Sequence, residues 1–131
     1  YLQEGQLAGM AFFYILDDLA YLSYLAVEES IRGRGYGSAI LEKIRNDYHD
    51  YRIVLDIEDV KEDALNYETR KKRRNFYINN GFEGTDIFYH IYHVDYEILA
   101  CGNKVTKEDW QRIIRYFWGP FAEKAVFPTV K

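Results

Sequence analysis

The chain has 131 residues, of which 48% are apolar and 29% are charged, and its formal net charge is −4. This length fits one domain, and the composition excludes a disordered tail. The negative charge argues weakly against a nucleic-acid partner, and no apolar run is long enough to span a bilayer. We expect a single domain over residues 1–131 with no membrane association.

Cys101 is the only cysteine, which excludes an intrachain disulfide and a metal site built on thiolates. The histidines His49, His90 and His93 fall at no familiar metal-ligand spacing, so we expect no metal. No secretory signal segment is visible either. These features favour a reducing, cytoplasmic location.

The first half of the chain alternates strands with a helix. Residues 6–16 and 20–27 are apolar and aromatic, which predicts two strands, and the acidic turn between them predicts an antiparallel hairpin. From Gly37 the apolar residues recur at helical spacing, and residues 52–57 predict a third strand. Strand, helix and strand of these lengths form a βαβ unit, so strands 20–27 and 52–57 should be parallel.

The second half begins with a polar segment, residues 61–80, that favours helix and ends at Gly81, a good helix-terminating residue. Residues 82–99 predict two strands that form a hairpin around residues 92–94. One α+β domain with a mixed sheet is the expected fold class.

A last helix is predicted from Thr106 to Trp118, with Thr106 and Asp109 placed as a capping box. Gly119-Pro120 should stop it. Tyr116, Trp118 and Phe121 lie off its apolar stripe. The segment should therefore cover a surface on this domain or on a second copy, and we favour a homodimer.

A glycine-rich loop joins the second strand to the first helix. It reads Leu25-Ala26-Val27-Glu28-Glu29-Ser30-Ile31-Arg32-Gly33-Arg34-Gly35-Tyr36-Gly37-Ser38. Such a turn exposes backbone N–H groups at a helix N-terminus, where the helix dipole also favours an anion. Arg32 and Arg34 add positive charge. The loop therefore predicts a phosphate or diphosphate site.

Three phosphate-binding motifs compete for this loop. A P-loop needs a lysine directly after its last glycine, whereas Ser38 follows Gly37 here. A dinucleotide fingerprint needs G-x-G-x-x-G, whereas Gly33, Gly35 and Gly37 alternate. The pattern R/Q-x-x-G-x-G/A is matched at every fixed position. An ordinary glycine-rich turn is the remaining alternative.

The third pattern, after a strand that ends Leu-Ala-Val, resembles the coenzyme A motif of the GNAT acetyltransferases. A second segment, Asn75-Phe76-Tyr77-Ile78-Asn79-Asn80-Gly81-Phe82, resembles the family's F-Y-x-x-x-G-F segment. The resemblance covers residues 1–99 and leaves 100–131 as a C-terminal helical extension. It implies a mixed sheet whose parallel central strands splay apart, flanked by helices.

The resemblance implies an N-acetyltransferase that moves an acetyl group directly from acetyl-CoA to a primary amine of a small molecule or protein. Backbone groups of the strand end would pair with the pantetheine arm, and an N–H near Val27 would hold the oxyanion. Tyr77 would protonate the leaving thiolate, although core packing alone would also explain this tyrosine. The cofactor-binding residues would be Leu25, Ala26, Val27, Arg32, Gly33, Arg34, Gly35, Tyr36, Gly37 and Ser38. Arg70 and Arg73 are added to them because helical spacing places both on one face with Tyr77.

The general base is less defined. Glu58, at the end of the third strand, is the candidate; Asp56 is a weaker one, and a water chain would serve equally well. Compared with the family domain, the chain lacks one strand and two helices at its N-terminus. These usually wall the acceptor pocket, so either a fragment has lost them or another chain supplies that wall.

Two other functions stay open at this point. The domain could bind acetyl-CoA without turnover, or it could acetylate RNA or another macromolecule through the basic run from Arg70 to Arg74. A solvated helix face explains that run as well.

Overall fold

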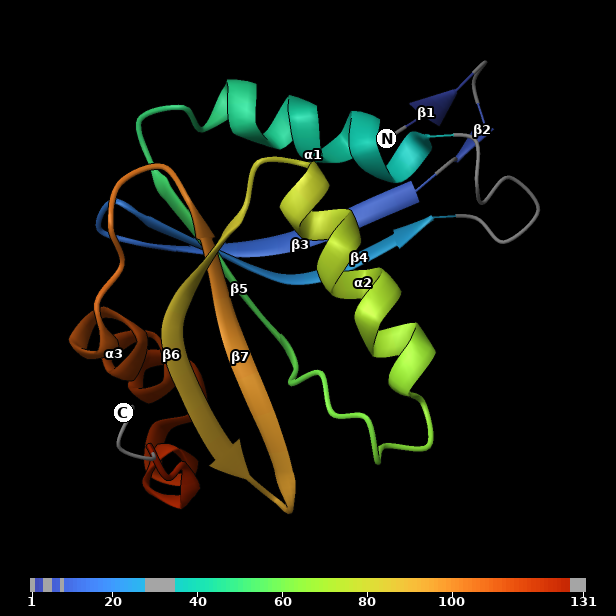
Figure 1. Ribbon diagram of the computed structural model, residues 1–131. Helices are drawn as coiled ribbons and strands as arrows, with labels where there is room; N and C mark the ends of the chain where they lie inside the picture. Colours follow the sequence, from blue (N-terminus) through green and yellow to red (C-terminus); the bar gives the residue numbers. More distant parts are fainter. Residues whose placement is uncertain (1, 4–5, 8, 28–34, 128–131) are drawn as a thin grey trace.

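The computed structural model describes residues 2–3, 6–7, 9–27 and 35–127. Within these residues one mixed sheet has five strands in the order β3-β4-β5-β7-β6 (Figure 1). The strands are β3 (Gly9–Leu16), β4 (Leu19–Val27), β5 (Arg52–Glu58), β6 (Glu83–Ile91) and β7 (Val94–Cys101). The helices are α1 (Tyr36–Asp47), α2 (Tyr67–Asn79) and α3 (Lys107–Trp118), and a short 3₁₀ helix, η2 (Gly119–Lys124), follows α3. The predicted α+β class is confirmed.

Two predicted elements differ in extent from those observed. The predicted strand 6–16 is divided, because β2 (Gln6–Leu7) pairs with β1 (Leu2–Gln3) in a separate two-stranded ribbon. The predicted helix 61–80 begins only at Tyr67, because residues 61–67 form turns closed by backbone hydrogen bonds from Ala64 to Lys61 and from Tyr67 to Ala64. Helix-favouring composition is a weak signal that such turns override.

Each face of the sheet has its own apolar core. Leu41 and Ile44 of α1 pack with Leu55 and the partly buried Tyr77 on one face. On the other face, Trp110 of α3 packs with a different set of strand residues. Figure 1 shows α1 along the top and α3 at the lower left, with the sheet between them. Within the described residues, no helix is both long enough and apolar enough to cross a bilayer.

β4 and β5 separate soon after they begin to pair. They are parallel, as predicted, but only three residue pairs join them, from Leu19–Arg52 to Tyr21–Val54. Beyond Tyr21 the register of β4 against β3 also shifts, because Phe13 faces Leu22 and Phe12 faces Tyr24. The intervening Ser23 is an extra residue, the mark of a β-bulge, and bulges bend the strand that carries them. The predicted splaying of the central strands is therefore confirmed.

The C-terminal helix α3 is built into the same domain. Its capping box forms as predicted: the Asp109 N–H donates to the Thr106 hydroxyl, and the Thr106 N–H donates to the Asp109 carboxylate. Arg52 ties the start of β5 to Asp109 at 2.7 Å and to Asp18 at 2.8 Å. Arg52 thus joins α3 to the sheet.

The apolar stripe of α3 covers its own sheet, which is one of the two alternatives expected for it. Trp110, Ile113 and Ile114 are buried there. The expectation that Trp118 points away from this stripe is wrong, because Trp118 packs against the same core, 6.3 Å from the Tyr89 ring. Tyr116 and Phe121 stay exposed, and the homodimer stays a prediction that light scattering of the chain would test.

We expect Trp110→Ala to lower the free energy of unfolding by about 3–5 kcal/mol, because it empties a fully buried site between α3 and the sheet. Phe121→Ala is the matched control. Phe121 is 62% exposed, so its loss should change stability by no more than about 0.5 kcal/mol. Urea denaturation followed by circular dichroism measures both. Equal stabilities for the two variants would show that α3 is not part of the core.

Candidate active site

The gap between the separated ends of β4 and β5 opens into two connected cavities. The first, which we call the glycine groove, has a volume of about 680 Å³. Its lining comprises Tyr24, Leu25, Ala26, Gly35, Tyr36, Gly37, Ser38, Lys72, Arg73, Phe76 and Tyr77. The second, the carboxylate slot, has a volume of about 360 Å³. Its lining comprises Leu22, Ser23, Tyr24, Leu25, Leu55, Asp56, Ile57, Glu58, Arg73, Tyr77 and Tyr96.

Four residues line both cavities and so mark the place where they meet: Tyr24, Leu25, Arg73 and Tyr77. Two come from β4 and two from α2. A molecule that extends along the glycine groove would therefore reach the carboxylate slot beside the Tyr77 ring. This junction is where two substrates could meet.

The N-terminus of α1 forms one wall of the glycine groove. Gly35 is the N-cap residue and has a φ of 80°, a left-handed conformation that glycine adopts without strain. Within the described residues no side chain caps this helix end, and its first turn carries no acidic residue. The positive end of the helix dipole therefore faces the groove, and no carboxylate of the first helical turn competes for it. Arg32, Gly33 and Arg34 of the predicted loop lie outside the described residues.

Tyr77 is held in place by the way α2 ends. Gly81 has a φ of 94°, as the predicted terminating residue requires. The Phe82 N–H then donates to the Tyr77 carbonyl at 3.1 Å, and the Gly81 N–H donates to the Ile78 carbonyl at 3.3 Å. These two bonds form a Schellman motif. Phe82 is buried, and its ring lies 5.7 Å from the Tyr77 ring, so the turn and the packing together fix this side chain.

The chemistry of the Tyr77 hydroxyl follows from its environment. Burial raises the pKa of Tyr77, although the nearby Arg73 opposes this shift and Asp56 adds to it. The hydroxyl therefore remains protonated at neutral pH and can act as a proton donor. No hydrogen bond between this hydroxyl and another described residue is present.

The basic run on α2 divides into structural and groove-facing residues. Arg70 lines neither cavity, because its guanidinium contacts Glu58, Asn66 and the Asp59 carbonyl. Arg74 forms a two-point ion pair with the buried Glu97, at 2.8 and 3.1 Å.

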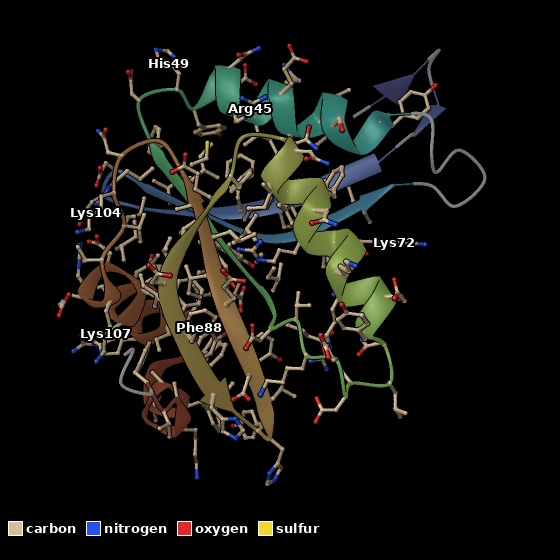
Figure 2. All side chains as sticks on the ribbon, in the orientation of Figure 1. Arg45, His49, Lys72, Phe88, Lys104 and Lys107 are labelled. Atoms are coloured by element: carbon tan, nitrogen blue, oxygen red, sulfur yellow. The ribbon has the colours of Figure 1, made fainter. Side chains whose placement is uncertain are left out.

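Arg73 and Lys72 are the two basic residues of this run that line the glycine groove. Figure 2 shows the Lys72 side chain extending outward from α2. The sequence grouped Arg70 with Arg73 by helical spacing and gave no reason to select Lys72. The way α2 packs on the sheet decides that Lys72 and Arg73 face the groove and that Arg70 does not.

Two carboxylates line the carboxylate slot, and they differ in their partners. Glu58 contacts two guanidinium groups, Arg70 at 2.9 Å and Arg73 at 3.5 Å. Asp56 accepts hydrogen bonds from two neutral hydroxyls, Tyr21 at 2.7 Å and Tyr89 at 2.6 Å. The contact partners of Glu58 are therefore cationic, whereas the hydrogen-bond partners of Asp56 are neutral.

The structure brings most of the sequence-predicted site residues together. Of the predicted residues, the glycine groove is lined by Leu25, Ala26, residues 35–38, Arg73 and Tyr77. Glu58 lines the adjoining carboxylate slot. Val27 ends β4 beside them. Sequence reasoning missed Tyr24, Tyr96, Tyr21 and Tyr89. No local signal along the chain singles out these four tyrosines. Within the described residues, no group of three or more His, Cys, Asp or Glu side chains could hold a metal ion.

Comparison with models of protein families matches residues 1–84 to the acetyltransferase (GNAT) domain. This match covers more than half of the chain, so the chain belongs to the GNAT acetyltransferase family. A comparison with curated protein sequences gives no match.

Solved structures of this family have the same fold. A GNAT-family protein from Bacteroides thetaiotaomicron is 23% identical with a TM-score of 0.68, over 85% of this chain and 65% of that one. The ribosomal-protein-S18-alanine N-acetyltransferase from Escherichia coli is 21% identical with a TM-score of 0.61, over 82% and 69%. A Bacillus subtilis acetyltransferase, solved with CoA, is 13% identical with a TM-score of 0.63, over 78% and 73%.

The chain thus spans about two thirds of the length of the Bacteroides protein. At these identities the likeness concerns the fold, and it confirms the predicted GNAT-like arrangement of a mixed sheet with splayed central strands.

Proposed function

We propose that this domain is an acetyl-CoA-dependent N-acetyltransferase that moves an acetyl group directly to a primary amine of a small molecule or protein. The observation that carries the proposal is the junction of the glycine groove and the carboxylate slot beside Tyr77. A phosphate-binding arm and a slot with acidic groups meet there at a protonated hydroxyl. Family membership supports the same reaction.

Acetyl-CoA fits the glycine groove in two respects. The uncapped N-terminus of α1 offers backbone N–H groups to its diphosphate, and Lys72 and Arg73 add positive charge. Beyond Tyr21, β4 is no longer paired with β5, so the backbone of Leu25 to Val27 is available to pair with the pantetheine arm as an added strand would. Arg32, Gly33 and Arg34 remain part of this proposal. Arg70 does not, because its contacts are within the protein.

Tyr77 is the proposed general acid. Acetyl-CoA would supply the acetyl group as a thioester, whose sulfur must leave as a thiol. Tyr77 lies at the junction and its hydroxyl stays protonated, so it can give its proton to the departing sulfur. Backbone N–H groups near Val27 would stabilise the oxyanion.

The proposed general base is one of the two slot carboxylates, and the contacts favour Asp56 over the initially preferred Glu58. A base must accept a proton from the acceptor's ammonium group to release the neutral amine that attacks. Two guanidinium groups already lie beside Glu58 and would repel the acceptor's ammonium group. Asp56 has only neutral donors on its two oxygens.

The acceptor can be identified by a screen that measures the release of free thiol from acetyl-CoA. The chain would be incubated with acetyl-CoA and with amines, amino acids, aminoglycosides and peptides, while the freed thiol is measured. The Escherichia coli neighbour is named for an alanine of a ribosomal protein, so peptides with a free N-terminal amine belong in the set. Thiol release that depends on one acceptor class would support the proposal, and CoA binding without release from any class would count against it.

We expect Ser38→Asp to weaken CoA binding by about tenfold to hundredfold, because it places a carboxylate where the diphosphate would lie. The same change adds the acidic residue that the first turn of α1 lacks, which should stabilise the helix by about 0.3–1 kcal/mol. Calorimetry with CoA measures the affinity, and Ser38→Ala is the matched control. A folded Ser38→Asp variant with unchanged affinity would remove the start of α1 from the cofactor site.

We expect Tyr77→Phe to lower kcat about 10²-fold with little change in acetyl-CoA affinity, because it removes the proton and keeps the ring. The alkaline limb of the pH profile should also disappear. In the wild type that limb should lie above the ordinary tyrosine pKa of about 10, because burial raises the pKa of Tyr77. Tyr51→Phe, a half-buried tyrosine packed against Tyr48, is the control. Full activity in Tyr77→Phe would return this residue to a packing role.

A further inference from the structure

Three strands bring their side chains together around the Asp56 carboxylate. Tyr21 of β4 donates to Oδ1 at 2.7 Å, and Tyr89 of β6 donates to Oδ2 at 2.6 Å. β6 is not the neighbour of β5, because β7 lies between them. Tyr89 therefore reaches across a whole strand to this oxygen. Each carboxylate oxygen receives one hydroxyl and keeps a lone pair for a further partner.

The rings behind the two hydroxyls are packed so that they cannot swing away. The Trp110 ring lies 5.2 Å from the Tyr21 ring and 5.6 Å from the Tyr89 ring, measured between centroids. Tyr89 also stacks on Tyr96 at 5.1 Å and is only 1% exposed. Trp110 is fully buried on α3, beyond the residues that match the family model. The C-terminal helix thus supports both tyrosines.

The two hydroxyls act as fixed donors. Burial, together with the adjacent Asp56 carboxylate, raises the pKa of both Tyr21 and Tyr89 far above the ordinary tyrosine value. They therefore stay neutral and protonated over the working pH range. Hydrogen bonds to a charged acceptor are stronger than those between neutral groups, so the pair holds the carboxylate in one orientation.

We propose that Tyr21 and Tyr89 are positioning residues: they clamp Asp56 in the carboxylate slot so that it receives the acceptor's ammonium group and takes its proton. This inference rests on the proposed acetyltransferase function. The step moves one proton from the ammonium nitrogen to an Asp56 oxygen and leaves the neutral amine. Neither tyrosine gains or loses a proton.

Other titratable groups also surround Asp56, and none of them is changed in the tyrosine variants used for the test. They are Tyr96 of β7, Tyr77 of α2, Arg73 of α2 and Glu58 of β5. A change in the acidic limb of the rate profile that follows the removal of one hydroxyl is therefore due to that hydroxyl.

The test is the pH dependence of kcat/KM in Tyr21→Phe, Tyr89→Phe and the double variant. Loss of a donor leaves the carboxylate less firmly held, so kcat/KM for the acceptor should fall about tenfold for each hydroxyl removed. The acidic limb should differ from that of the wild type in each single variant and most in the double variant. Asp56→Asn should abolish the limb. The KM for acetyl-CoA should stay unchanged, because neither tyrosine lines the glycine groove.

Tyr48→Phe is the matched control, because it removes a hydroxyl from a half-buried tyrosine that packs on Phe13, on the α1 side of the sheet. Its acidic limb should equal that of the wild type. Folded, active tyrosine variants with a wild-type limb would overturn the proposal. If the double variant does not fold, the single variants carry the test, since each removes one donor.

A second readout needs no activity. Hydroxyl protons that are buried and bonded to a carboxylate exchange slowly with water, so two should appear in the proton NMR spectrum at neutral pH. One should vanish in Tyr21→Phe, the other in Tyr89→Phe, and both should shift in Asp56→Asn. Signals indifferent to Asp56→Asn would overturn the clamp. If these signals are present but no amine is acetylated, the result would contradict the proposed function and leave the clamp unaffected.

Discussion

The rest of the site depends on the parting of β4 from β5. Parallel strands are held by a ladder of backbone bonds, and here that ladder ends after three residue pairs. The extra Ser23 in β4 bends the strand away just beyond this point. The backbone of β4 then faces open space rather than a neighbour, and carboxylates of β5 line the gap. The strands thus part after one irregular residue, while β4 stays paired with β3 and β5 stays paired with β7.

The three helices are attached to this sheet by different forces. α1 and α3 each bury three apolar residues, whereas α2 has no buried residue along its length. The partly buried Phe76 and Tyr77 pack on the core near the end of α2, and ion pairs from Arg70 to Glu58 and from Arg74 to Glu97 hold the helix as well, together with the Schellman turn that ends it. The same helix lines the glycine groove with two basic residues, Lys72 and Arg73, and two aromatic residues, Phe76 and Tyr77. α2 therefore both supports the site and lines it.

The C-terminal helix links the site to a part of the chain outside the family match. Trp110 fills the core on one face of the sheet and touches the rings of Tyr21 and Tyr89. The capping box at Thr106 and the Arg52 contacts fix where this helix starts, so the tryptophan cannot slide along the sheet. α3 is therefore part of the packing behind the carboxylate slot, although it lies outside the residues that match the family model.

The sequence by itself determined the features that arise from local interactions. The glycine loop before α1, the capping box at Thr106 and the turn at Gly81 depend on residues a few positions apart, so their patterns are readable along the chain. Only the tertiary structure decided which carboxylate has cationic partners and which has neutral ones. Asp56 meets its partners across 35 and 33 residues, through the alignment of three strands. Such long-range contacts depend on register and on helix placement, which no local pattern encodes.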